Sequence, residues 1–202
     1  MAPSTSNAPV ALITGAGKGI GRAMTLGLLS KGMRVAAVDR DEQSLLALKH
    51  LANQSDQAEC LELFTEDLTS FDAVSLVDRV QARLGSINIL INNAGLGQGQ
   101  VRSDYHRHPP KFYDVTSEQW LNAIAVNANA VFLLSQVVAK RMLGSGWGRI
   151  INVTTSLGTM LREGYCPYGP TKAAAEGLSA VMASDLAGSG VTVNVLIPGG
   201  IV

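Results

Sequence analysis

Cysteine is nearly absent from this 202-residue chain, which has only Cys60 and Cys166. The two residues lie far apart in the sequence, and neither forms part of a CxxC pair. Disulfide scaffolds and zinc sites need more cysteines at closer spacing, so the sequence argues against both. His106 and His108 lie close together without a third ligand at a recognised spacing, and we expect no metal site. Two isolated thiols fit a reducing compartment, so we expect the protein to be cytoplasmic.

An excess of one charge and long apolar segments are also missing. Lys plus Arg and Asp plus Glu number 16 each, so the formal net charge is zero. Proteins that bind nucleic acids or anionic membranes carry basic patches, so we expect neither kind of partner. No apolar run approaches the ~20 residues that span a bilayer. Residues 1–9 lack the basic start and apolar centre of a signal peptide, and we interpret them as a flexible tail.

Apolar residues, in contrast, make up 47% of the chain, enough for one self-sufficient core. Short apolar runs alternate with longer stretches of helical pattern, which is typical of βαβ units in a parallel sheet. Several runs are apolar at consecutive positions, which favours strands covered by helices on both faces. We therefore predict a single α/β domain over residues 10–202, a Rossmann-type doubly wound parallel sheet in a three-layer α/β/α sandwich. The predicted strands are residues 10–14, 34–39, 60–65, 87–92, 149–154 and 191–197.

Glycines and capping residues mark the ends of the predicted helices. The first helix begins near Gly19 and ends before Gly32, where a left-handed residue is expected. A fourth helix is predicted over residues 117–142 and a last one over residues 168–187, with an irregular loop over residues 96–115. Capping signals begin the second, third and fourth helices at Asp41, at Thr69 with Asp72, and at Thr116 with Gln119.

A glycine-rich turn, TGAGKGIG, follows the first predicted strand at residues 14–21. The strict G-x-G-x-x-G spacing is not met, and Gly15, Gly19 and Gly21 instead give G-x-x-x-G-x-G. Such glycines allow a positive φ and let backbone N–H groups approach a pyrophosphate at a helix N-terminus. Tight packing alone could also require such a turn, so the turn by itself leaves both interpretations open.

The second predicted strand ends in Asp39, close to the spacing at which a carboxylate binds the adenosine ribose of a dinucleotide. A carboxylate there repels a 2′-phosphate and favours NAD over NADP. Lys18 and Arg40 act in the opposite direction, because either could bind that phosphate. The alternative for Asp39 is a helix cap or a solvated strand end. We expect a nicotinamide cofactor, NAD in preference to NADP.

Tyr168 and Lys172 lie on one face at the start of the last predicted helix. Pro170, between them, falls in the first turn, where its missing N–H is tolerated. An ammonium about 4 Å from a phenol lowers the phenol's pKa by about three units toward neutrality, where a general acid/base works best. The spacing alone is common in helices, so its meaning depends on the neighbouring motifs.

Five motifs in order make the chain resemble the short-chain dehydrogenase/reductase family from about Val10 onward. They are TGAGKGIG at residues 14–21, Asp67-Leu68, NNAG at residues 92–95, YGPTK at residues 168–172 and PGG at residues 198–200. The resemblance implies hydride transfer between a nicotinamide cofactor and a small alcohol or carbonyl substrate. It also implies a homodimer or homotetramer that pairs through the fourth and last helices.

The resemblance also implies the roles of particular residues. Tyr168 is then the acid/base, Lys172 lowers its pKa and binds the nicotinamide ribose, and Asn127 orients a proton-relay water. Asp67 and Leu68 flank the adenine, and the turn at residues 92–95 steadies the sheet behind the cofactor. The candidate cofactor-binding residues are Gly15, Gly17, Lys18, Gly19, Ile20, Gly21, Asp39, Arg40, Asp67, Leu68, Asn93, Ala94, Gly95, Tyr168, Lys172, Pro198 and Gly199.

The chain departs from the family pattern at two points. The usual position of the family's serine is Thr155 here, with Ser156 next to it. Successive residues at a strand end face opposite ways, so one hydroxyl points at the substrate, and we favour Thr155 on spacing. The chain is also shorter than usual members, which continue into a substrate-covering segment. The alternative function is therefore a non-catalytic dinucleotide-binding module, a sensor or scaffold, or an inactive fragment.

Overall fold

The computed structural model describes residues 8–55 and 57–199 of the chain. Residues 1–7 of the predicted tail and Gly200 of the PGG motif lie outside this described part.

Six parallel strands form one sheet in the order β3-β2-β1-β4-β5-β6. Each predicted strand is present, and its ends agree with the prediction to within one residue. The order reverses between β1 and β4, as in a doubly wound fold, so the predicted fold class is confirmed. The strands are β1 (Val10–Thr14), β2 (Arg34–Asp39), β3 (Leu61–Thr65), β4 (Ile87–Asn92), β5 (Gly148–Val153) and β6 (Val191–Leu196).

Helices fill the connections between the strands. The predicted fourth helix is one continuous helical stretch in which a π-turn, Ala125–Asn129, separates α4 from α5. The loop over residues 96–115 contains two short 3₁₀ turns, Gln98–Gln100 and Phe112–Asp114, and a third such turn, Ala58–Cys60, precedes β3. The α-helices are α1 (Gly19–Leu29), α2 (Glu42–Asn53), α3 (Ala73–Leu84), α4 (Ser117–Ile124), α5 (Ala130–Ser145), α6 (Leu157–Met160) and α7 (Tyr168–Asp185).

Two of the three predicted caps are confirmed, and one is wrong. Asp41 accepts a hydrogen bond from Ser44 N at the start of α2, and Thr116 and Gln119 form the full capping box of α4. The third cap is Asp72 alone, which accepts from the first turn of α3. Thr69 takes no part in it, because its backbone N–H and its hydroxyl both donate to Asp67 Oδ1, each at 2.9 Å.

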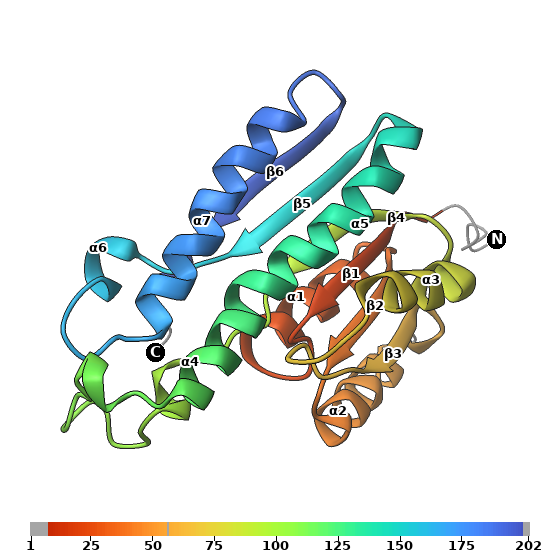
Figure 1. The fold of residues 1–202 in the computed structure, drawn as a ribbon. Helices are drawn as coiled ribbons and strands as arrows, with labels where there is room; N and C mark the ends of the chain where they lie inside the picture. The colour runs from red at the N-terminus through yellow and green to blue at the C-terminus, as the bar shows by residue number, and fades with distance from the viewer. Residues whose placement is uncertain (1–7, 56, 200–202) are drawn as a thin grey trace.

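Two apolar cores lie on opposite faces of the sheet. Helices α1 and α2 cover one face, and α3, α5 and α7 cover the other (Figure 1). All residues of β1 are buried, which is why its sequence is apolar without alternation. Strand β6 is unlike β1, because Thr192, Asn194 and Leu196 are exposed. No helix in the described part of the chain covers that face of β6, and its outward residues alternate with the buried Val191 and Val193.

The stretch Ser117–Ser145 is long and apolar enough, by composition alone, to cross a membrane. Half of its most apolar window is buried inside the protein, which is equally typical of the central helix of a globular α/β domain.

All six strands point the same way, so their carboxyl ends meet at one edge of the sheet. The glycine turn, the end of β2, the turn after β4 and the segment between β5 and α7 all begin at that edge. In doubly wound sheets this edge holds the ligand, so the fold gathers the predicted motifs there.

Candidate active site

The glycine turn between β1 and α1 packs directly on the turn that follows β4. Gly15 has a φ of +63°, and a Cβ there would lie 2.8 Å from Ala94 Cα. A Cβ at Gly21 would lie 2.1 Å from the carbonyl oxygen of Gly15. Only glycine fits these two positions, so tight packing does require glycines in this turn. The same packing leaves the N-terminus of α1 at the edge of the sheet, with no acidic residue in its first turn.

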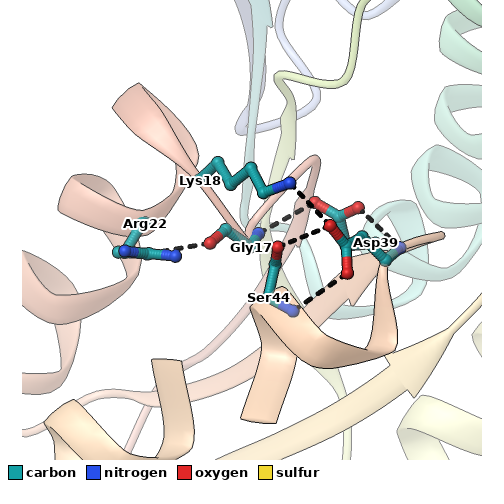
Figure 2. Close-up of polar contacts among 6 residues, drawn as sticks. Gly17, Lys18, Arg22, Asp39 and Ser44 are labelled. Atoms are coloured by element: carbon teal, nitrogen blue, oxygen red, sulfur yellow. Dashed lines mark hydrogen bonds and ion pairs between the residues drawn. The ribbon is translucent and has the colours of Figure 1, made fainter. Parts of the chain in front are cut away.

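Asp39 joins the glycine turn to the start of α2, as Figure 2 shows. Its Oδ2 accepts from Gly17 N at 2.9 Å, and its Oδ1 accepts from Asp41 N at 3.0 Å. A Cβ at Gly17 would lie 2.8 Å from Ser44 Cβ and 3.0 Å from Asp39 Oδ2, so a larger residue there would press against both side chains. Asp39 is thus more than a solvated strand end, and the cap of α2 is Asp41.

Lys18 forms an ion pair with the exposed carboxylate of Asp41. The two charged atoms lie 2.6 Å apart, and Ser44 donates to the same carboxylate from its backbone N–H and its hydroxyl. The hydrogen bond from Lys18, supported by those from Ser44, holds the pKa of Asp41 well below its usual value. Lys18 is therefore already neutralised, and a phosphate would have to compete with Asp41 for it.

A cleft of about 260 Å³ opens between the ends of β1, β2, β3 and β4. It brings together the predicted Gly15, Asp39, Arg40, Asp67, Leu68, Asn93, Ala94 and Gly95. Its other lining residues, Glu66, Leu96, Gln100 and Val126, were not predicted. The remaining predicted cofactor residues, Gly17, Lys18, Gly19, Ile20, Gly21, Tyr168, Lys172, Pro198 and Gly199, lie outside its lining.

Asp67 is held in place at one wall of the cleft. The backbone N–H of Thr69 lowers the pKa of Asp67, and the hydroxyl of Thr69 and the charge of Arg40 act in the same direction. This carboxylate is thus ionised and oriented before any ligand arrives.

The turn after β4 is joined by three hydrogen bonds to the end of β1 and by one to the glycine turn. Asn93 Nδ2 donates to Thr14 O at 2.9 Å and to Gly15 O at 3.0 Å. The backbone N–H groups of Asn93 and Ala94 both donate to Thr14 Oγ1 at 3.1 Å. These bonds tie the ends of β1 and β4 together behind the cleft.

Lys172 is buried, with 3% of its surface exposed, and its Nζ donates to Val153 O at 2.8 Å. A Cβ at Gly95 would lie 3.2 Å from Nζ, so the ammonium stands between β5 and the turn after β4. Burial lowers the pKa of Lys172 to about 8. Tyr168, the first residue of α7, is half-buried on the same helix.

The side chain of Asn127 lies in the π-turn and is fully buried. Its Oδ1 accepts from Leu96 N at 2.8 Å, while its Nδ2 donates to Leu96 O at 3.1 Å and to Thr171 Oγ1 at 2.9 Å. Both amide N–H groups are thereby used within the protein. That Asn127 orients a proton-relay water stays a prediction.

The two candidate hydroxyl residues follow β5. Thr155 is 6% exposed, whereas Ser156 is half-buried and occupies the N-cap position of α6 without a side-chain capping bond. The choice between them stays a prediction. In the described part of the chain no three His, Cys, Asp or Glu side chains gather as metal ligands.

Comparison with known proteins gives consistent relatives. A family model described as short chain dehydrogenase matches residues 9–202. The 3-oxoacyl-acyl-carrier-protein reductase FabG of Escherichia coli (strain K12) is 32% identical over 190 residues, which cover 94% of this chain and 72% of that protein. Gluconate 5-dehydrogenase of Gluconobacter oxydans is 34% identical over 192 residues, covering 94% and 70%. A crystal structure of a metagenomic short-chain oxidoreductase in complex with NADP superposes with a TM-score of 0.84 at 29% identity, covering 97% of this chain and 85% of that one.

The buried ammonium predicts a pH-dependent stability. Below about pH 8, Lys172 is charged in both the folded and the unfolded chain, so the cost of burying it is present in full. Between about pH 8 and 10.5 the folded chain loses this proton first, so the free energy of unfolding rises with pH. Lys172→Met should therefore raise the free energy of unfolding at pH 7 by up to about 3 kcal/mol. Urea unfolding at several pH values should show this gain shrinking above pH 8.

The control for that experiment is Lys49→Met, which also removes a lysine that donates to a backbone carbonyl, Ala58 O, at 2.6 Å. A difference between Lys172→Met and the wild type that stays constant from pH 7 to 10 would contradict burial as its cause.

Proposed function

We propose, on the premise that the chain belongs to the short-chain dehydrogenase/reductase family and is an NAD(P)-dependent oxidoreductase, that Tyr168 is the acid/base of its reaction. The observation that carries this proposal is the buried Lys172 on the same helix face as Tyr168, four residues on. The alternative of a non-catalytic module has no support in the comparisons, where the relatives named above are reductases and dehydrogenases.

The residues present fit a nicotinamide dinucleotide. The N-terminus of α1, free of acidic residues in its first turn, suits the pyrophosphate. Asp39 lines the cleft where the adenosine ribose would lie, and Asp67 and Leu68 form the wall for the adenine. When bound, the cofactor accepts or supplies a hydride at C4 of its nicotinamide.

The chain's own residues then move the proton. In the oxidation direction the phenolate of Tyr168 accepts the proton of the substrate hydroxyl, and in the reduction direction the phenol returns it to the carbonyl oxygen. With a pKa of about 8, Lys172 is charged in most molecules at neutral pH, so its ammonium stabilises the phenolate. The hydroxyl of Thr155 donates to the substrate oxygen in this proposal, and Ser156 is its rival for that role.

The substrate proposed is a small secondary alcohol or its ketone. One relative named above is a 3-oxoacyl reductase and the other a gluconate 5-dehydrogenase, so ethyl acetoacetate and 5-keto-D-gluconate are the first probes.

Replacement of Tyr168 tests the proposal directly. Because general acid/base catalysis contributes about 10²–10⁴-fold, Tyr168→Phe should lower kcat by that factor while the cofactor Kd stays within about twofold. NADH or NADPH oxidation with the two probe ketones measures kcat, and quenching of cofactor fluorescence measures the cofactor Kd. A Tyr168→Phe variant with near wild-type kcat would contradict the role of Tyr168.

The same assay tests the choice of hydroxyl. Thr155→Val should lower kcat by about 10²-fold and Ser156→Ala should not. A loss of kcat in Ser156→Ala alone would reverse the choice of hydroxyl.

The preference for NAD over NADP is also proposed. It is supported by the Asp39 carboxylate in the cleft and by the Asp41 carboxylate that already neutralises Lys18, while Arg40 in the cleft opposes it. The wild type should bind NADH at least about tenfold more tightly than NADPH, and Asp39→Ala should reduce or reverse this ratio. The ratio is the readout, because damage to the glycine turn would weaken both cofactors. Tighter NADPH binding by the wild type would show that Arg40 and Lys18 outweigh Asp39.

Pairing of subunits through α5 and α7 is the last part of the proposal. Phe132 and Leu133 on α5 and Val181 on α7 are exposed apolar residues on the two helices. Light scattering after size exclusion should give a dimer or tetramer, and Val181→Glu should shift it toward monomer. The control is Leu46→Glu, at an exposed leucine on α2. A wild type that elutes only as monomer would contradict the pairing.

A further inference from the structure

The first turn of α7 lacks one of its backbone hydrogen bonds. The N–H groups of Gly169 and Thr171 donate to the carbonyls four residues earlier, Tyr165 O at 2.8 Å and Pro167 O at 3.1 Å. Between them stands Pro170, which has no N–H. The carbonyl of Cys166, two residues before Tyr168, therefore loses the donor that the helical pattern would give it.

A side chain from another part of the chain supplies the missing donor. Gln98 Nε2 donates to Cys166 O at 2.9 Å across 68 positions of sequence. Gln98 is only 4% exposed although it lies in a loop turn, and its Oε1 is buried without a hydrogen-bond partner. Burying a carboxamide with half of its capacity unused costs free energy. The hydrogen bond from Gln98 to Cys166 O offsets part of this cost.

One hydroxyl lies within hydrogen-bond distance of the next two carbonyls. Thr171 Oγ1 lies 2.9 Å from Pro167 O and 3.0 Å from Tyr168 O, and it can donate its proton to either. The same oxygen accepts from Asn127 Nδ2 at 2.9 Å, and Thr171 is 0% exposed. The side chains of Gln98 and Thr171 therefore lie within hydrogen-bond distance of three consecutive carbonyls, ending with that of Tyr168.

We propose that Gln98 and Thr171 are positioning residues that hold the backbone of Tyr168 where its phenol meets the substrate and Lys172. The inference rests on the proposed function of Tyr168. Tyr168 is the first residue of its helix, and helix ends fray unless they are tied down. A displacement of about 1 Å can cost about 10²-fold in rate, so a frayed first turn would be expensive for catalysis.

The chain offers a matched comparison on the same helix. Ser179 Oγ donates to the carbonyl four residues earlier, Ala175 O, at 2.7 Å, and accepts from Asn152 Nδ2 at 2.8 Å. It is buried like Thr171 and likewise donates to the carbonyl four residues earlier and accepts from an asparagine amide, but it lies two turns farther from Tyr168. Ser179→Ala therefore removes an equivalent buried hydroxyl without touching the first turn.

The test compares kcat, KM and cofactor Kd for the wild type, Thr171→Val, Thr171→Ser, Gln98→Met and Ser179→Ala, with ethyl acetoacetate and 5-keto-D-gluconate as probes. Thr171→Val and Gln98→Met should each lower kcat about tenfold or more, with KM and cofactor Kd within about threefold. Thr171→Ser should restore kcat to within about threefold, because the hydroxyl is back. Ser179→Ala should lower the melting temperature as Thr171→Val does and leave kcat within about twofold.

The outcomes separate this inference from the function on which it rests. If Tyr168→Phe keeps its kcat, the proposed function fails. If Tyr168→Phe loses kcat while Thr171→Val and Gln98→Met keep theirs, only the positioning inference fails. A loss of kcat in Ser179→Ala equal to that in Thr171→Val would also overturn the inference, because it would mark a general effect of stability. Should Thr171→Val not fold, the kcat of Gln98→Met decides.

Discussion

The hydrogen bonds between Asn93 and the end of β1 are the contact on which the rest of the site depends. Strands β1 and β4 are neighbours in the sheet but are far apart in the sequence, and the sheet reverses its order between them. Asn93 ties the carbonyls of Thr14 and Gly15 to the turn after β4, and Gly15 is small enough for the two turns to touch. The cleft opens in front of this joint, so the glycine turn, Asp39 and Lys172 keep fixed places relative to one another only while it holds.

The buried ammonium of Lys172 has opposite effects on the stability of the fold and on the proposed chemistry. Lys172 is surrounded by protein, and its Nζ donates to a backbone carbonyl, Val153 O. Desolvation lowers the pKa of this ammonium, but only to about 8. The group thus remains charged near neutral pH, where it can stabilise a phenolate, although the fold would be more stable without it.

The sequence could predict the strands to within one residue because consecutive apolar residues mark strands that are buried on both faces. It could also place Asp39 and Lys172, since motif spacing carries that information. It was wrong about Thr69, whose hydroxyl donates to Asp67 two residues earlier. It missed Gln98, whose partner lies 68 positions away in sequence and follows no local period. Pro170 shows that the carbonyl of Cys166 needs another donor, but not which residue provides it.

The two ends of the site are held by different kinds of contact. Substitutions therefore change the free energy of unfolding by different amounts at the two ends. At the adenosine end, Lys18 and Asp41 form an exposed ion pair, which contributes little to stability and is screened by salt. At the proposed catalytic end, the buried side chains of Asn127 and Gln98 join residues 96–98 to Thr171 and to Cys166. Exposed contacts can be exchanged with small changes in the free energy of unfolding, whereas a buried polar network loses much when one member is removed. We therefore expect substitutions at residues 18, 39 and 40 to change the cofactor preference while the geometry around Tyr168 stays intact.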